Sequence, residues 1–252
     1  MTNLKRRSFM GFSISMASLL LATLLIVNNV SAQTSPPPEG QYRKLETRVA
    51  TTSAGKKIEV IEFFWFGCAH CNALDPALEV WLKKMPADVS FKRVHVSFGE
   101  RTDIHQRLFL TLEALGLNAT QNASVFTEIH AKNKKMTTRE EVLAWAQSRN
   151  LDMKKFTATF DDRFTMARKQ ASAAQLQAAY KVDGVPHFGI DGQYITSPSI
   201  ARSEAGFFNT LEYLIQITRK KNSLMNTVAT ATATVKQAIK KSESKNTSIN
   251  NQ

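Results

Sequence analysis

The chain contains two cysteines, and both lie in one four-residue motif, Cys68-Ala69-His70-Cys71. Two thiols at this spacing can ligate a metal, hold a haem, form a structural disulfide or exchange between dithiol and disulfide. A zinc site needs more ligands at matched spacing, but there is no second cysteine pair and the other histidines are scattered along the sequence. Haem attachment needs a histidine directly after the second cysteine, and position 72 is asparagine.

A purely structural disulfide is a weak explanation for this motif. Closing so short a loop would stabilise the folded chain by only about 2 kcal/mol in the chain-entropy model. The motif lies between the apolar run 58–65, typical of a buried strand, and apolar residues at helical spacing from 74 to 85. We therefore interpret the motif as a redox dithiol and expect no metal and no cofactor.

A redox dithiol at the start of a helix gives its two cysteines different roles. An ordinary thiol is only about 3% thiolate at pH 7, because its pKa is near 8.5. The unpaired N–H groups and the dipole at a helix N-terminus favour an anion, so Cys68 is the candidate nucleophile. His70, in the first turn, can add a charge or a donor. Cys71 lies further into the helix and suits the resolving role.

The elements around the motif predict an α/β domain with a helical interruption. The strand at 58–65, the helix that Pro86 ends, and the alternating Val94, Val96 and Phe98 form a strand–helix–strand unit. Residues 103–180 read as almost wholly helical, with expected N-caps at Asp103, Asn118 and Thr138. Extended structure returns at 185–190, followed by a turn at 191–192 and an amphipathic helix over 207–215.

Residues 62–71, read as Glu-Phe-Phe-Trp-Phe-Gly-Cys-Ala-His-Cys, resemble the active-site strand and turn of DsbA-type thiol:disulfide oxidoreductases. The similarity extends through 184–188 and 191–194 and covers nearly all of residues 41–218. It implies an α/β thioredoxin fold interrupted by an inserted helical domain. We accordingly expect thioredoxin-like parts at 33–102 and 181–218 and the helical domain at 103–180. Position 69 departs from the commonest family motif, because alanine replaces proline there.

The resemblance also assigns residues outside the motif. It implies that Pro186 follows Val185 in a cis peptide, lies against the cysteines and helps to bind an extended substrate chain. His187 and Phe188 are expected to border that groove. Glu62, six residues before Cys68, corresponds to a buried acid that can exchange a proton with Cys71. A glutamate facing solvent from the strand is the alternative interpretation.

Most of the positive charge lies at the two ends of the chain. The net charge is +12, from 33 Lys and Arg against 21 Asp and Glu. Residues 1–32 combine three basic residues with an apolar run, and they read as an export signal; an uncleaved membrane anchor is the alternative. Residues 219–252 carry a net charge of about +6 and little apolar periodicity, and we expect a disordered basic tail. Only about +3 remains for the domain, which indicates no nucleic-acid partner.

These observations predict a periplasmic enzyme that introduces disulfides into exported proteins through Cys68 and Cys71. The expected partners are unfolded or reduced exported proteins and, by resemblance, a quinone-linked membrane oxidase of the DsbB type. We expect a monomer, because residues 33–58 contain no dimerisation module. A disulfide reductase or isomerase on the same fold is the first alternative. The second is a protein of another class that binds substrates without redox activity.

Overall fold

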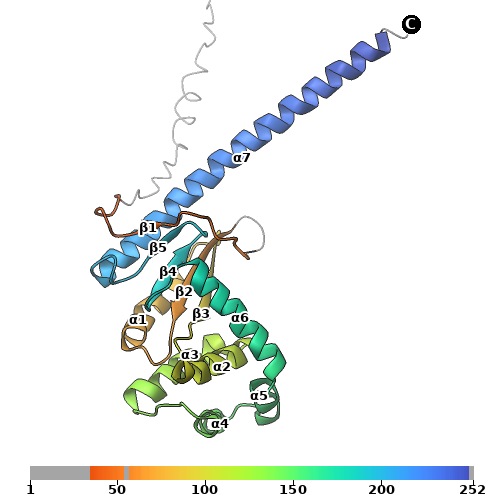
Figure 1. Ribbon diagram of the computed structural model, residues 1–252. Helices are drawn as coiled ribbons and strands as arrows, with labels where there is room; N and C mark the ends of the chain where they lie inside the picture. The colour runs from red at the N-terminus through yellow and green to blue at the C-terminus, as the bar shows by residue number, and fades with distance from the viewer. Residues whose placement is uncertain (1–34, 54–56, 250–252) are drawn as a thin grey trace, which may run out of the picture. The chain divides into compact units, whose positions relative to one another are not determined.

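The computed structural model describes residues 35–53 and 57–249, so the predicted signal lies outside the described residues. Within this part of the chain, five strands form one sheet in the order β1-β5-β4-β2-β3, drawn in Figure 1. Strand β2 runs parallel to β3 and antiparallel to β4. The strands are β1 (Arg43–Lys44), β2 (Ile58–Phe64), β3 (Val89–His95), β4 (His187–Ile190) and β5 (Tyr194–Thr196).

Most of the described helices lie between β3 and β4 in the sequence. Figure 1 shows α2 to α5 together at one end of the sheet, with α1 and α6 on different sides of β2. The helices are α1 (Ala69–Lys83), α2 (Glu100–Ala114), α3 (Asn118–Phe126), the π-helix η1 (Thr127–Ala131), α4 (Arg139–Ser148), α5 (Met153–Phe160), α6 (Arg163–Ala179) and α7 (Glu204–Ile249). This is a thioredoxin fold with an inserted helical domain.

Strand β2 is buried along its whole length, which explains its nearly continuous apolar sequence. Val60 packs with α1 and α7 on one face of the sheet, whereas Ile61 and Phe63 pack with Tyr180 on the other face. Phe64, at the end of the strand, belongs to a third apolar cluster formed mainly by the inserted helices. The strand that precedes the cysteine motif is therefore anchored in all three apolar clusters.

Two expectations about element boundaries need correction. Strand β3 begins at Val89, and Phe98 lies beyond its end with half of its surface exposed. The capping box at Thr138 is confirmed. The Thr138 side chain accepts from the Glu141 N–H, and the Glu141 carboxylate accepts from the Thr138 N–H. Asp103 instead lies inside α2, and Asn118 is the first residue of α3 rather than its cap. A cap-like pair of residues is short enough to recur by chance inside a helix.

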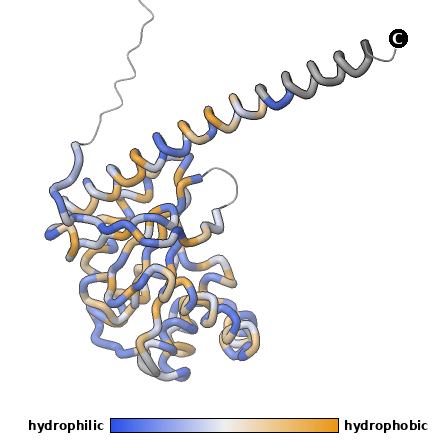
Figure 2. Tube along the Cα trace, turned by 45° about the horizontal axis from the view of Figure 1, so that its top comes forward, coloured by the Kyte–Doolittle hydropathy of each residue, from blue (hydrophilic) through white to orange (hydrophobic). Residues whose placement is uncertain are grey.

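The prediction of a disordered tail is wrong for residues 219–249, which continue helix α7. The start of α7 packs on the sheet through Phe207, Leu211 and Leu214. That packing removes the cost of helix nucleation, so each added residue extends the helix by one hydrogen bond. Residues 223–234 of this helix are exposed and mix hydrophobic and hydrophilic side chains (Figure 2). No helix in the described part of the chain is long and apolar enough to span a membrane.

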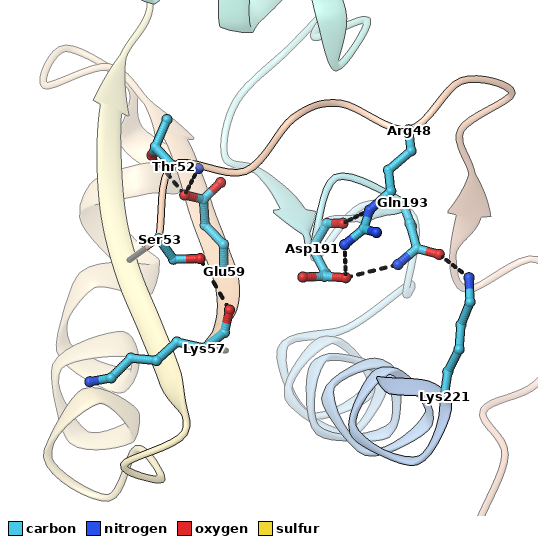
Figure 3. Close-up of polar contacts among 8 residues, drawn as sticks. All are labelled: Arg48, Thr52, Ser53, Lys57, Glu59, Asp191, Gln193 and Lys221. Carbon is cyan, nitrogen blue, oxygen red and sulfur yellow. Dashed lines mark hydrogen bonds and ion pairs between the residues drawn. The ribbon is translucent and has the colours of Figure 1, made fainter. Parts of the chain in front are cut away.

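The segment before β2 is held to the sheet by two groups of polar contacts, shown in Figure 3. The Arg48 guanidinium pairs with the Asp191 carboxylate at 2.7 Å, and the Gln193 amide donates to the same carboxylate oxygen. The backbone N–H and hydroxyl of Thr52 both donate to Glu59, at 3.0 and 2.8 Å. We call these two groups of contacts the latch.

Candidate active site

The turn after β2 places Cys68 at the N-cap of helix α1. Cys68 has an extended backbone, with φ −83° and ψ 118°, and its carbonyl accepts the first helical hydrogen bond from the Asn72 N–H at 3.0 Å. No side chain caps this helix, so N–H groups of its first turn are available to the cysteine sulfur. Cys68 is half-buried and Cys71 is buried, and both are free thiols in this structure.

The surroundings of Cys68 stabilise its thiolate. A hydrogen bond from the Cys71 thiol is the largest contribution, and it lowers the pKa of Cys68 to about 6 against desolvation, which acts in the opposite direction. The backbone N–H groups of Cys71 and His70 lower the pKa further. Burial raises the pKa of Cys71 strongly, and its hydrogen bond to Cys68 acts in the same direction. One thiol is thus prepared as an anion and the other as its proton donor.

His70 is exposed beside the thiolate. Its backbone N–H and its ring both lower the pKa of Cys68, although less than the Cys71 thiol does. The side chain lines a groove next to the motif. The structure therefore places His70 where its charge can act on Cys68 and where a bound chain can touch it.

A groove of about 670 Å³ lies beside the motif and is lined in part by the loop before β4. Val185 and Pro186 line it, and the peptide between them is cis, as predicted. The Val185 carbonyl lies 3.4 Å from Cys68 Sγ and accepts a hydrogen bond from it when Cys68 is protonated. A cavity of similar size, about 690 Å³, lies along α7 and contains no motif residue. The groove beside Cys68 is therefore the one relevant to thiol chemistry.

The side chains of the two residues after Pro186 lie in different environments. His187 lines the groove as expected, although it is 3% exposed. Phe188 was expected there too, but it is fully buried and packs against Phe207 with ring centroids 4.5 Å apart. The reason is the alternation of side chains along β4, which turns neighbouring residues to opposite faces of the sheet.

Glu62 is buried, so the solvent-facing interpretation is excluded. Its side chain is 3% exposed and pairs with the Arg93 guanidinium at 2.7 Å. Arg93 also pairs with Asp75 at 2.7 Å and with Glu79 at 3.3 Å, both on α1. Desolvation raises the pKa of Glu62, while Arg93 opposes the increase. The Glu62 charge also raises the pKa of Cys71, which places this acid within electrostatic reach of the dithiol.

Three histidines beside the motif were missed by the sequence interpretation. His95, His105 and His130 served there only to argue against zinc, yet all three contact the two residues that precede Gly67. The sequence signal was weak: His95 lies between Val94 and Val96, out of phase with the apolar alternation, and the other two lie in the helical segment with no distinguishing pattern around them. Among the described residues, no three His, Cys, Asp or Glu side chains are grouped to hold a metal.

Comparisons with known proteins agree with this geometry. A family model described as "Thioredoxin" matches residues 52–206. The thiol:disulfide interchange protein DsbA of Azotobacter vinelandii is 33% identical over 205 residues, which make up 80% of this chain and 95% of that protein. Its Bordetella pertussis counterpart is 35% identical over 205 residues, which make up 81% of this chain and 95% of that protein.

Solved structures give the same result. The crystal structure of Pseudomonas aeruginosa DsbA matches with a TM-score of 0.70 and 34% identity, covering 73% of this chain and 95% of that one. Reduced DsbA1 from Neisseria meningitidis matches with a TM-score of 0.64 and 25% identity, covering 75% of this chain and 99% of that one. The chain therefore belongs to the DsbA family of thiol:disulfide interchange proteins.

Proposed function

We propose that this protein is a periplasmic dithiol oxidase that introduces disulfides into exported proteins. The observation that carries the proposal is the position of Cys68 at the N-cap of α1, which no side chain caps and where the Cys71 thiol and first-turn N–H groups lower the pKa of Cys68 to about 6. At that pKa about nine-tenths of Cys68 is thiolate at pH 7. Stabilising the reduced form makes the Cys68–Cys71 disulfide a stronger oxidant.

The reaction proceeds in two exchanges. A substrate thiolate attacks Cys68 Sγ of the disulfide, a mixed disulfide forms, and Cys71 leaves and takes up a proton. A second substrate thiolate then attacks the substrate sulfur, and Cys68 leaves as a thiolate. The substrate gains one disulfide and the enzyme gains the two electrons. A low pKa suits Cys68 to this second step, because a more acidic thiol is the better leaving group.

Three other side chains support these steps. Glu62 exchanges a proton with Cys71, since burial raises the pKa of this acid and its charge acts on the Cys71 thiol. His70 adds to the stabilisation of the Cys68 thiolate from the groove side. The backbone of Val185, next to Pro186, pairs with an extended substrate segment as an added strand.

The partners are those that the family resemblance implies. The substrates are reduced or unfolded exported proteins, and a quinone-linked membrane oxidase of the DsbB type restores the disulfide. The enzyme acts as a monomer, reaches the periplasm through its N-terminal signal, and needs no cofactor of its own.

The test is to equilibrate the protein with glutathione buffers of defined ratio and to titrate Cys68. We expect a reduced form that persists in mildly oxidising buffer, together with a thiolate that forms near pH 6. An equilibrium as reducing as that of thioredoxin, with an ordinary thiol pKa, would replace the oxidase by a reductase. Complete absence of thiol exchange would leave a protein that binds substrates without redox activity.

A further inference from the structure

His95, the last residue of β3, holds the backbone N–H of Phe66. Its Nε2 accepts that N–H at 3.2 Å, and its Nδ1 lies 2.9 Å from the Val96 carbonyl. Because one ring nitrogen accepts and the other must donate, His95 is bound as the neutral tautomer with its proton on Nδ1. The side chain is 1% exposed, and burial lowers its pKa well below the ordinary value, in agreement with a neutral ring.

His105, in helix α2, holds the ring of Trp65 in the same manner. The Trp65 indole N–H donates to His105 Nδ1 at 2.9 Å, and His105 Nε2 donates to the Lys135 carbonyl at 2.8 Å. The Trp65 ring in turn covers Gly67. A Cβ on that glycine would lie 2.4 Å from the Trp65 Cζ2 atom, so only glycine fits beneath the indole. The position of Trp65 thus limits the path of the chain immediately before Cys68.

His130 holds the other side of the Phe66 peptide. It lies in the π-helix η1, and its Nε2 donates to the Phe66 carbonyl at 2.8 Å. A single π-helical turn displaces side chains from ordinary helical positions and is frequent at functional sites. The N–H and the C=O of Phe66 therefore both bind histidines, one from the sheet and one from the inserted helical domain.

The segment held in this way is the turn that delivers Cys68 to its helix. The Cys68 N–H donates to the Trp65 carbonyl at 3.0 Å, which closes residues 65–68 into one turn. The orientation of this turn sets where the Cys68 sulfur lies relative to the N–H groups of His70 and Cys71, which stabilise its thiolate. A change in the turn would move the sulfur away from donors that are fixed in the helix.

We propose that His95, His105 and His130 are positioning residues that hold the turn 65–67 and thereby keep Cys68 at the N-cap of helix α1. The inserted domain supplies His105 and His130. Through these two contacts it influences the acidity of Cys68, in addition to packing against the two cysteines. The significance of this positioning for catalysis rests on the dithiol oxidase function proposed above. Its geometry can be tested in the reduced protein alone, without a substrate.

Two pairs of variants separate hydrogen bonding from packing. His130→Leu removes the donor to Phe66, whereas His130→Gln keeps an N–H near the position of Nε2. His105→Leu removes the acceptor for Trp65, whereas His105→Asn keeps an oxygen near the position of Nδ1. Phe109→Leu is the control, because Phe109 packs against the Phe66 and His95 rings but makes no hydrogen bond to the turn.

The readouts are the ultraviolet absorbance of the Cys68 thiolate against pH and the equilibrium constant with glutathione, measured on full-length protein. We expect each Leu variant to lower the acid dissociation constant of Cys68 by at least about threefold, which raises its pKa by about half a unit. The Gln and Asn variants should recover most of the wild-type value. Phe109→Leu should lower the melting temperature without changing either redox readout.

Several results would overturn the proposal. One is a folded Leu variant with an unchanged titration and glutathione equilibrium, and another is an equal change in the Leu variant and its polar counterpart. If a Leu variant does not fold, Trp65→Phe tests the same bond to His105, and an unchanged titration there counts against the proposal. Failure of the proposed function would show differently, as wild-type protein that cannot oxidise a reduced peptide whatever these variants do.

Discussion

Strand β2 carries two buried glutamates that invite comparison, Glu59 and Glu62, each 3% exposed. They are three residues apart, so they lie on opposite faces of the sheet. Glu62 pairs with Arg93 at 2.7 Å, on the face covered by α1. Glu59 pairs with Lys92 at 3.1 Å. It also accepts two hydrogen bonds from Thr52, as Figure 3 shows.

The two sites differ in what lies next to them. The charge of Glu62 acts on the Cys71 thiol, whereas Glu59 belongs to the latch that ties the segment before β2 to the sheet. A buried acid with a basic partner is therefore not by itself a sign of catalysis. We call the part of β2 around Glu62 the active-site end and the part around Glu59, with the latch, the latch end. We expect substitutions at the active-site end to alter thiol exchange and substitutions at the latch end to alter stability.

The largest effect should follow from Cys68→Ser, which removes the nucleophile at the active-site end. Oxidation of a reduced test protein should be abolished, since no other free thiol of the chain is partly exposed. Cys71→Ser is the matched control: it should also lose oxidation but should still form a mixed disulfide through Cys68. Oxidase activity retained by Cys68→Ser would refute the assignment of the nucleophile.

Glu62→Gln and Glu59→Gln test the comparison directly. Glu62→Gln should slow thiol exchange by at least about tenfold at pH 7, because it removes the group that we propose exchanges a proton with Cys71. Glu59→Gln should leave the rate within about twofold while lowering the melting temperature, since no reacting group lies beside it. Stopped-flow measurement of exchange with a reduced peptide gives both rates. Equal rate losses in the two variants would remove the distinction between the two ends.

Arg48→Leu should destabilise the latch end without affecting exchange. Asp191 has a side chain that is 4% exposed, and the substitution would leave its charge without an ionic partner. Breaking a fully buried pair costs 3–5 kcal/mol, but half of the Arg48 side chain is exposed, so we expect about 2 kcal/mol. Urea denaturation measures the loss. Adding Asp191→Asn should recover part of it, whereas a further loss in the double variant would contradict this explanation.

Acidification should lower the stability of the reduced enzyme, because it protonates the Cys68 thiolate. The folded pKa, about 6, lies below that of an unfolded thiol, so the thiolate stabilises the reduced form fully above the unfolded pKa. This stability decreases as pH falls and is lost below about pH 6. After allowance for solvent screening, the contribution is about 1 kcal/mol at pH 7. The difference in unfolding free energy between wild type and Cys68→Ser, measured from pH 8 to pH 5, should show this trend; a flat difference would contradict it.

The smallest effect should come from truncation after Ser223. Helix residues 224–234 are exposed, so their removal should change the unfolding free energy by less than about 0.5 kcal/mol and leave exchange unchanged. Truncation after Thr218 is the comparison, because it also removes the ion pair between Arg219 and Asp88 at 2.6 Å. A large loss from the shorter truncation would reveal a structural role for the exposed helix.

The active-site motif could be predicted because its chemistry is local. The spacing of Cys68 and Cys71, the apolar strand before them and the helix after them all lie within about 25 consecutive residues. The family resemblance added Val185 and Pro186, and the structure places both at the dithiol. The same local reasoning failed for the tail, because whether a weak helix persists depends on the packed helix that it extends.

The sequence was sufficient to specify the redox dithiol, the interrupted α/β fold and the buried strand, because these depend on residue types at short, regular spacings. Only the tertiary structure revealed which face each glutamate of β2 occupies and which histidines meet at the turn. His105 and His130 lie 40 and 64 residues from their partners in that turn. Contacts over such distances depend on how the inserted helices pack against the sheet, and no local pattern in the sequence encodes them.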